Sequence, residues 1–148
     1  MSLLKQFEKL LKIAEKKEQE LAIILEKTQR YFDEQKQKLH QLQDYEMDYH
    51  NNFAQQGQQG INGSFLCDYQ NFLIQLKNII NQQRKMISIA VFEVERKTKE
   101  WKTSYQTRIK IRKLVEKYKS EENKQYERHQ QKIIDELVST ISYRNEEN

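Results

Sequence analysis

Apolar side chains recur at alternating intervals of three and four residues along two long stretches of the chain. In the first stretch they fill 11 of the 15 positions of one heptad series from Leu4 to Phe53. In the second they fill 12 of 16 positions from Leu66 to Tyr118. The polar exceptions are Glu18, Thr28, Gln35 and Glu46 in the first stretch and Gln83, Lys97, Ser104 and Arg108 in the second. Because this spacing places the side chains on one seam of a supercoiled helix, it predicts a coiled coil.

All three glycines of the chain lie between the two stretches, within residues 57–63. Glycine adopts positive φ angles at little cost, so this segment favours a turn. We expect helices over about residues 3–54 and 65–141, joined by a glycine-rich turn at 55–64. Ser64 is the candidate N-cap of the second helix, with Asp68 in its first turn.

A turn this short makes the two helices antiparallel. It also pairs residues whose numbers add up to about 119, so that Leu4 lies opposite Val115 and Leu25 opposite Val94. The fold class is therefore predicted to be all-α, a single antiparallel coiled-coil domain over residues 1–148.

The second helix is predicted to be longer than the first. The first helix ends opposite residue 117 or so, and residues 119–132 contain one apolar side chain, Tyr126. We expect residues 119–141 to form an overhang, followed by a frayed tail at 142–148. Apolar residues then recur at helical spacing on the overhang: Ile133, Ile134, Leu137, Val138 and Ile141. We expect another protein to bind these apolar residues. The alternatives are that the chain folds back onto them or that a second copy of the chain covers them.

Composition limits the classes of protein that the chain can belong to. Apolar residues make up 36% and charged residues 32%, and there is no proline. Such a chain favours an elongated helical shape and excludes an all-β fold. No apolar run is long enough to cross a membrane, and the N-terminus lacks the apolar core of a signal peptide. The single Cys67 cannot form an internal disulfide, so the cytoplasm is the expected compartment.

The residues give no indication of catalysis. A two-helix hairpin offers no pocket on which polar groups could converge, and the glycines lack the flanking residues of a phosphate-binding loop. His40, His50 and His129 are far apart and have no metal-ligand neighbours at suitable spacing. We therefore predict a protein that is not an enzyme and that holds no cofactor or metal.

Positive charge is concentrated in residues 96–119, which hold ten basic and two acidic side chains. Three interpretations remain open. The stretch can be a solvated helix face, a docking surface for an acidic protein, or a nucleic-acid contact. Helical spacing scatters these charges around the axis, which makes the last the weakest of the three.

Near the turn, the hairpin carries more apolar side chains than a two-helix seam can hide. One stripe holds Leu42, Tyr45 and Tyr49, and the facing helix holds Phe72, Leu76, Ile79 and Gln83. Each apolar residue alone can be core. Together they favour a docking patch.

These segments resemble the flagellar FliJ family of the type III export apparatus. The resemblance rests on residues 42–49 (LQDYEMDY), 68–76 (DYQNFLIQL), 79–83 (IINQQ), Trp101 and 131–136 (QKIIDE), in this order around the glycine turn. It implies an antiparallel coiled-coil stalk whose paired termini enter the hexameric flagellar export ATPase. It further implies promotion of ring assembly, a link to the membrane export gate, and an escort of export chaperones.

By the same resemblance, the export gate would bind one surface of the hairpin. Its residues here are Leu42, Tyr45, Tyr49, Phe72, Leu76, Ile79 and Gln83, and Lys38 extends it. The candidate ATPase-ring residues are Arg112, Lys113, Lys117, Ile133, Ile134 and Leu137. We expect a chain that is monomeric alone, does not insert into the membrane or bind nucleic acid, and associates with the inner face of the cell membrane at the flagellar base. The alternatives are a stalk protein of a virulence secretion system and a basic nucleic-acid-binding coiled coil.

Overall fold

A computed structural model describes residues 2–60 and 62–147. Two helices account for nearly all of them, α1 (Leu3–Gly57) with 55 residues and α2 (Gly63–Glu147) with 85 residues. The helices pack against each other in antiparallel directions and the second is the longer, so the predicted fold class is confirmed. Both helices are longer than expected, because α1 continues three residues past 54 and α2 is helical through the predicted tail. Ile61 of the turn and Asn148 of the tail lie outside the described residues.

Side-chain oxygens cap both helix starts. Ser2 Oγ accepts a hydrogen bond from the Lys5 amide at 3.2 Å, and Asn62 Oδ1 accepts one from the Phe65 amide at 2.8 Å. The prediction of Ser64 as the second cap is therefore wrong. Because Asn62 satisfies the free amide, α2 begins two residues before 65, and its first turn contains no acidic residue.

One glycine of the turn has a positive φ angle. Gly60 has a φ of 92°, a left-handed conformation that residues with a Cβ rarely adopt. The Gln59 and Gly60 amides donate to the carbonyls of Gln56 and Gly57, at 3.0 and 3.4 Å. These bonds close the chain onto the last turn of α1.

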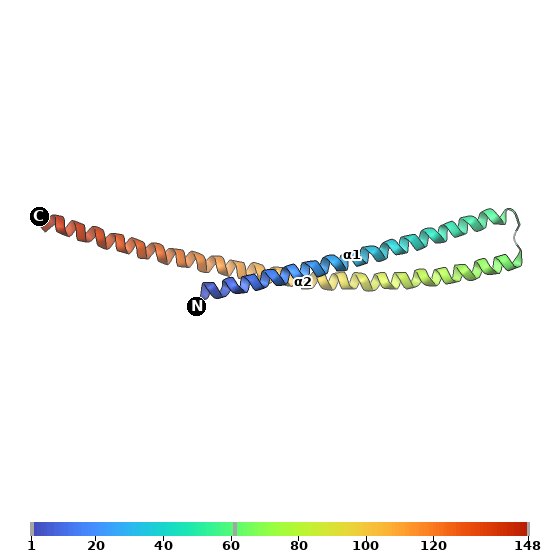
Figure 1. The fold of residues 1–148 in the computed structure, drawn as a ribbon, viewed down its shortest axis with the longest axis horizontal. Helices are drawn as coiled ribbons and strands as arrows, with labels where there is room; N and C mark the ends of the chain where they lie inside the picture. The colour runs from blue at the N-terminus through green and yellow to red at the C-terminus, as the bar shows by residue number, and fades with distance from the viewer. Residues whose placement is uncertain (1, 61, 148) are drawn as a thin grey trace. The chain divides into compact units, whose positions relative to one another are not determined.

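The chain divides into two units, which we describe separately. Unit 1 contains residues 1–19 and 103–148, and unit 2 contains residues 20–102. In each unit a segment of α1 packs along a segment of α2, and the turn belongs to unit 2 (Figure 1). Whether residues 1–148 behave as a single domain stays a prediction.

The heptad series predicted the buried positions of both helices. All 15 positions from Leu4 to Phe53 are buried or half-buried, polar exceptions included. In α2 the same holds for 15 of 16 positions. Leu66 is the one failure, since it is 41% exposed while the neighbouring Phe65 stacks on Phe53.

Polar exceptions in the seam pair with each other across it. In unit 2, Gln83 Nε2 donates to Oε1 and to the backbone carbonyl of Gln35, at 2.8 and 2.9 Å. Gln35 is the most completely buried large side chain, at 1% exposure. In unit 1, Arg108 forms an ion pair with Glu18, and both side chains are about five-sixths buried. Polar partners inside a seam penalise other registers, because a shift would leave them unpaired.

The predicted register fits unit 2 better than unit 1. In unit 2, His50 lies opposite Tyr69, as a sum of 119 requires. In unit 1, Phe7 stacks on Tyr118 rather than lying opposite position 112. The Glu18–Arg108 pair has a sum of 126, so the cross-seam contacts of unit 1 agree with each other and place the α2 partner further along the helix than predicted.

Candidate interaction surfaces

The grooves on the hairpin are open, and charged and amide side chains predominate in their linings. One groove, of about 600 Å³, is lined by Asp33, Lys36, Gln37, His40 and Gln41. Among residues 2–60 and 62–147, no three metal-binding side chains come together. Over the same residues, no helix has the length and apolarity that a membrane crossing needs.

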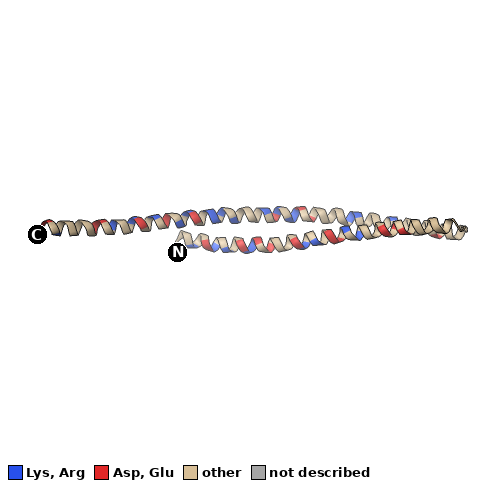
Figure 2. Ribbon diagram, turned by 90° about the horizontal axis from the view of Figure 1, so that it is seen from above, with Lys and Arg blue, Asp and Glu red and all other residues tan. Residues whose placement is uncertain are grey.

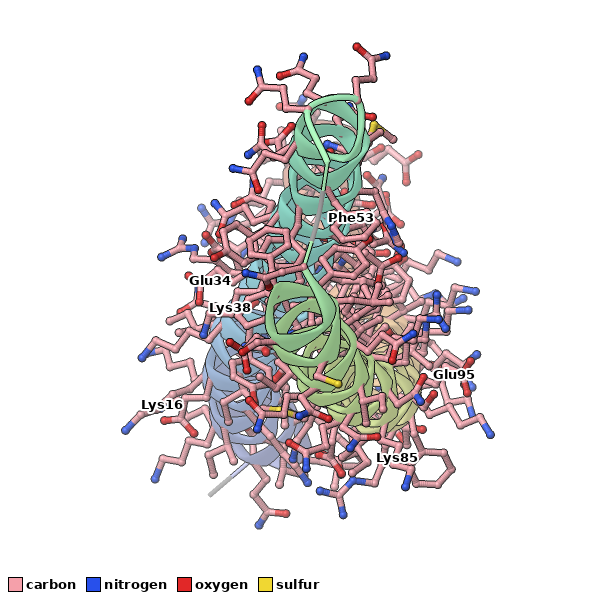
Figure 3. All side chains as sticks on the ribbon, turned by 90° about the vertical axis from the view of Figure 1, so that its right-hand side faces the viewer. Lys16, Glu34, Lys38, Phe53, Lys85 and Glu95 are labelled. Carbon is pink, nitrogen blue, oxygen red and sulfur yellow. The ribbon has the colours of Figure 1, made fainter. Side chains whose placement is uncertain are left out.

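An aromatic cluster fills the seam beside the turn. The Phe53 ring stacks on Tyr69 at 3.7 Å between centroids, and Tyr49 stacks on the same ring at 5.1 Å. Phe72 then packs on Tyr49 at 4.3 Å and meets the edge of Tyr45 at 6.0 Å. Figure 3 shows Phe53 near the turn end of the hairpin. Aromatic contacts of this kind add to the burial of apolar area, so this level of the hairpin is well fixed.

The phenol of Tyr69 in this cluster has a raised pKa. Burial raises the pKa of its phenol above 10.0, and the charges of Tyr49 and Glu46 add to the rise. Its hydroxyl lies 2.6 Å from Nδ1 of His50 and can donate to that nitrogen when the ring is neutral. The phenol is therefore held protonated across the seam.

Residues predicted to bind the export gate differ in their exposure. Tyr45 and Ile79 are 52% and 48% exposed, and Leu42, Tyr49 and Phe72 are half-buried. Two predicted members lie inside the seam instead. Leu76 is 4% exposed, and Gln83 is buried in its hydrogen bond to Gln35. Lys38 is exposed and lies on the same outer side of α1 as Glu34 (Figure 3).

Two exposed apolar residues beside this surface were not predicted. Tyr31 is 46% exposed and Met86 is 42% exposed. Tyr31 lies fourteen residues before Tyr45, and Met86 lies seven residues after Ile79. This seven-residue spacing is the signal that could have identified them.

Several basic residues of the 96–119 stretch already have acidic partners. In unit 2, Arg96 pairs with Glu93 and Lys97 with Glu100, at 2.9 and 3.4 Å. In unit 1, the predicted ring-binding residue Arg112 pairs with Glu15 of α1 at 3.4 Å, beside the Glu18–Arg108 pair. These contacts use part of the positive charge within the hairpin. Lys113 and Lys117 are exposed.

Beyond Tyr118, every described residue of α2 is exposed. The apolar members of this overhang include Ile133, Ile134 and Leu137, at 39, 50 and 57% exposure. Its charges are of both signs (Figure 2). The overhang is thus a helix whose apolar residues have no cover in the described part of the chain.

The apolar face of the overhang does not continue the seam. Extending the three-and-four spacing from Tyr118 leads through polar residues such as Lys132 and Glu136, whereas Ile133 and Leu137 each follow by one residue. One residue turns an α-helix by about 100°. The overhang therefore presents its apolar face in a different direction from the side that packs on α1.

These features define an antiparallel two-helix hairpin with exposed apolar residues beside its seam and along its overhang. A protein-family comparison matched residues 4–147 to the family described as the flagellar FliJ protein. The chain belongs to the FliJ family, and it is a non-enzymatic component of the flagellar export apparatus. No curated protein and no solved structure matched the chain in the comparisons made with them.

Proposed function

We propose that this protein is a stalk of the flagellar export apparatus that binds the hexameric export ATPase through its overhang. Residues 119–147 carry this proposal. They form a continuous helix with an uncovered apolar face, and that face is turned away from the side that packs on α1. An exposed apolar stripe on a helix is a binding surface for another protein, since water solvates it poorly. Lys113 and Lys117 provide positive charge next to the overhang.

The second contact of the stalk is the membrane export gate. Tyr45 and Ile79, with the half-buried Leu42, Tyr49 and Phe72, form its surface, while Leu76 and Gln83 hold the helices beneath it. By linking the ATPase to the gate, the protein acts in the cytoplasm at the inner face of the membrane. Escort of export chaperones belongs to the same proposal, although no residue here is assigned to it.

The overhang proposal is tested by ATP hydrolysis of the cognate export ATPase with and without this chain. We expect the wild-type protein to raise the rate. Leu137→Asp should reduce the stimulation at least fivefold, because a carboxylate on the apolar face would be desolvated in the complex. The side chain of Leu137 is exposed, so the fold should tolerate the change.

Ser139→Asp is the matched control. It introduces the same charge two residues away, on the polar row that continues the seam, and it should leave the stimulation unchanged. Circular dichroism verifies that both variants keep their helicity. Equal stimulation by Leu137→Asp and wild type would rule out the overhang as the ATPase contact.

A further inference from the structure

Two rows of residues flank the seam of unit 2 on one side. Each member directly precedes a seam residue, and the rows meet where the Tyr45 and Phe72 rings touch. Apolar side chains dominate this side, which we call the apolar edge. Its members are Ile24, Tyr31 and Tyr45 on α1 and Phe72, Ile79 and Met86 on α2.

The opposite side of the same seam has a different character. Its members directly follow seam residues, and most of them are polar or charged. Its α1 members are Ala22, Gln29, Lys36, Gln43 and His50, and its α2 members are Gln70, Lys77, Arg84, Val91 and Thr98. Solvation of a two-helix hairpin needs no such asymmetry. The contrast therefore marks the apolar edge as a surface that is covered in use.

The dimensions of the edge suit a single helix. Ile24 and Tyr45 are 21 residues apart, which corresponds to about 31 Å along α1 at about 1.5 Å per residue. Five of the six members are between 40 and 52% exposed, and Phe72 is half-buried. Two half-exposed apolar rows with a period of seven, one on each helix beside the seam, offer a third helix positions on which to pack its own apolar stripe.

Among the charged residues in the rows of the edge are Glu93, which is seven residues after Met86 and pairs with Arg96, and Lys38. Lys38 lies between Tyr31 and Tyr45 in the α1 row, and it forms no ion pair within the described ranges. A partner that covers the edge would bury this ammonium group partly. Such burial is tolerated when a carboxylate lies opposite.

We propose that the apolar edge docks one amphipathic α-helix of the export gate protein, about three heptads long, with an acidic residue facing Lys38. The hairpin then becomes the scaffold of a three-helix bundle. The inference rests on the proposed gate contact. It extends that contact along both helices to Tyr31, Met86 and Ile24, beyond the surface that the family resemblance implies.

The extension is tested by measuring the affinity of this chain for the cytoplasmic portion of the cognate gate protein. Tyr31→Ala and Met86→Ala should each weaken binding about tenfold, as for large side chains that a partner covers. Val91→Ala and Gln43→Ala, on the opposite side of the seam, are the controls and should bind as wild type does. All four sites are exposed, and thermal unfolding verifies that the variants remain folded.

Lys38→Glu tests the charge complementarity. It should weaken binding at least tenfold. Replacing the facing acidic residue of the gate helix by Lys should then restore the affinity for the Lys38→Glu variant, and it should not improve the affinity for the wild type. Hydrogen exchange on the gate protein should show one protected segment of about 20 residues. Protection in scattered short segments would overturn the single-helix occupant.

The outcomes separate the extension from the gate contact itself. Weaker binding by Tyr45→Ala and Phe72→Ala, with Tyr31→Ala and Met86→Ala unchanged, would overturn the extension and leave the gate contact standing. No binding by the wild type would overturn both. A chain that sediments as a dimer alone, and as a monomer after Tyr31→Ala, would assign the edge to a second copy and overturn the proposal.

Discussion

Buried polar residues decide which seam positions face each other. Gln35 and Gln83 occupy positions that apolar side chains fill elsewhere, and the Gln83 amide donates to the side-chain and backbone oxygens of Gln35. Such a pair adds little net stability compared with an apolar pair of the same size. Its main effect is that any other register would bury an amide without a partner.

Replacing one member of this pair should cost more than replacing both. Gln35→Leu leaves the Gln83 amide buried without its side-chain partner, so we expect a loss of about 1 to 3 kcal/mol in the free energy of unfolding. The double variant Gln35→Leu, Gln83→Leu should recover most of that loss. Chemical denaturation of both single variants and the double variant measures the coupling. Additive losses would mean that the pair does not act as a unit.

Tyr69 makes the stability of the hairpin depend on alkaline pH. Its pKa is higher in the folded chain than the usual 10.0, so the folded state holds the proton more tightly than the unfolded state. The stability from this difference is fully present below about pH 10 and is lost as the pH rises through the folded pKa.

Tyr69→Phe should therefore flatten the decline of stability above pH 10. The measurement is the free energy of unfolding between pH 8 and pH 11. Tyr126→Phe in the exposed overhang is the control and should keep the wild-type slope. An unchanged slope in Tyr69→Phe would show that other groups cause the alkaline decline.

At the scale of the helices, the heptad series predicted nearly every buried position and the overhang. It could do so because a period of 3.5 residues leaves few alternatives to a helical seam. The residue pairs that face each other across the seam were harder to predict from the sequence. Phe7 meets Tyr118, six residues beyond the partner that a sum of 119 gives, because that sum assumes one register for the whole chain whereas the contacts of unit 1 follow a different one. The cap at Asn62 was missed because Ser64, two residues later, offers the same chemistry.

The turn between the helices should be sensitive to the loss of one particular glycine. A Cβ at Gly60 would meet no atom within 4 Å, so the cost of Gly60→Ala comes from its φ of 92° alone. We expect a loss of about 1 kcal/mol in the free energy of unfolding. Gly63→Ala, at the start of α2, also meets no atom and should not destabilise the hairpin. Equal losses of stability from the two changes would show that the positive φ at position 60 does not cause the cost of Gly60→Ala.

At the scale of the molecule, candidate surfaces for different partners lie in different units. The gate surface and the apolar edge belong to unit 2, whereas the overhang belongs to unit 1. Sequence patterns indicated that both surfaces carry surplus apolar residues. The heptad series separates seam members such as Leu76 from Tyr45, which lies beside the seam. It could not tell that Phe72 is half-buried while Tyr45 is exposed, because both lie one residue before a seam position.

The central claim is that this protein links the export ATPase to the export gate through separate surfaces. The most direct test is capture of the cognate ATPase on immobilised gate protein, with and without this chain. We predict capture only when the wild-type chain is present. Leu137→Asp should stay bound to the gate and fail to recruit the ATPase, while Ser139→Asp should recruit it normally. Capture of the ATPase to the same level without the chain, or undiminished capture by Leu137→Asp, would contradict this account.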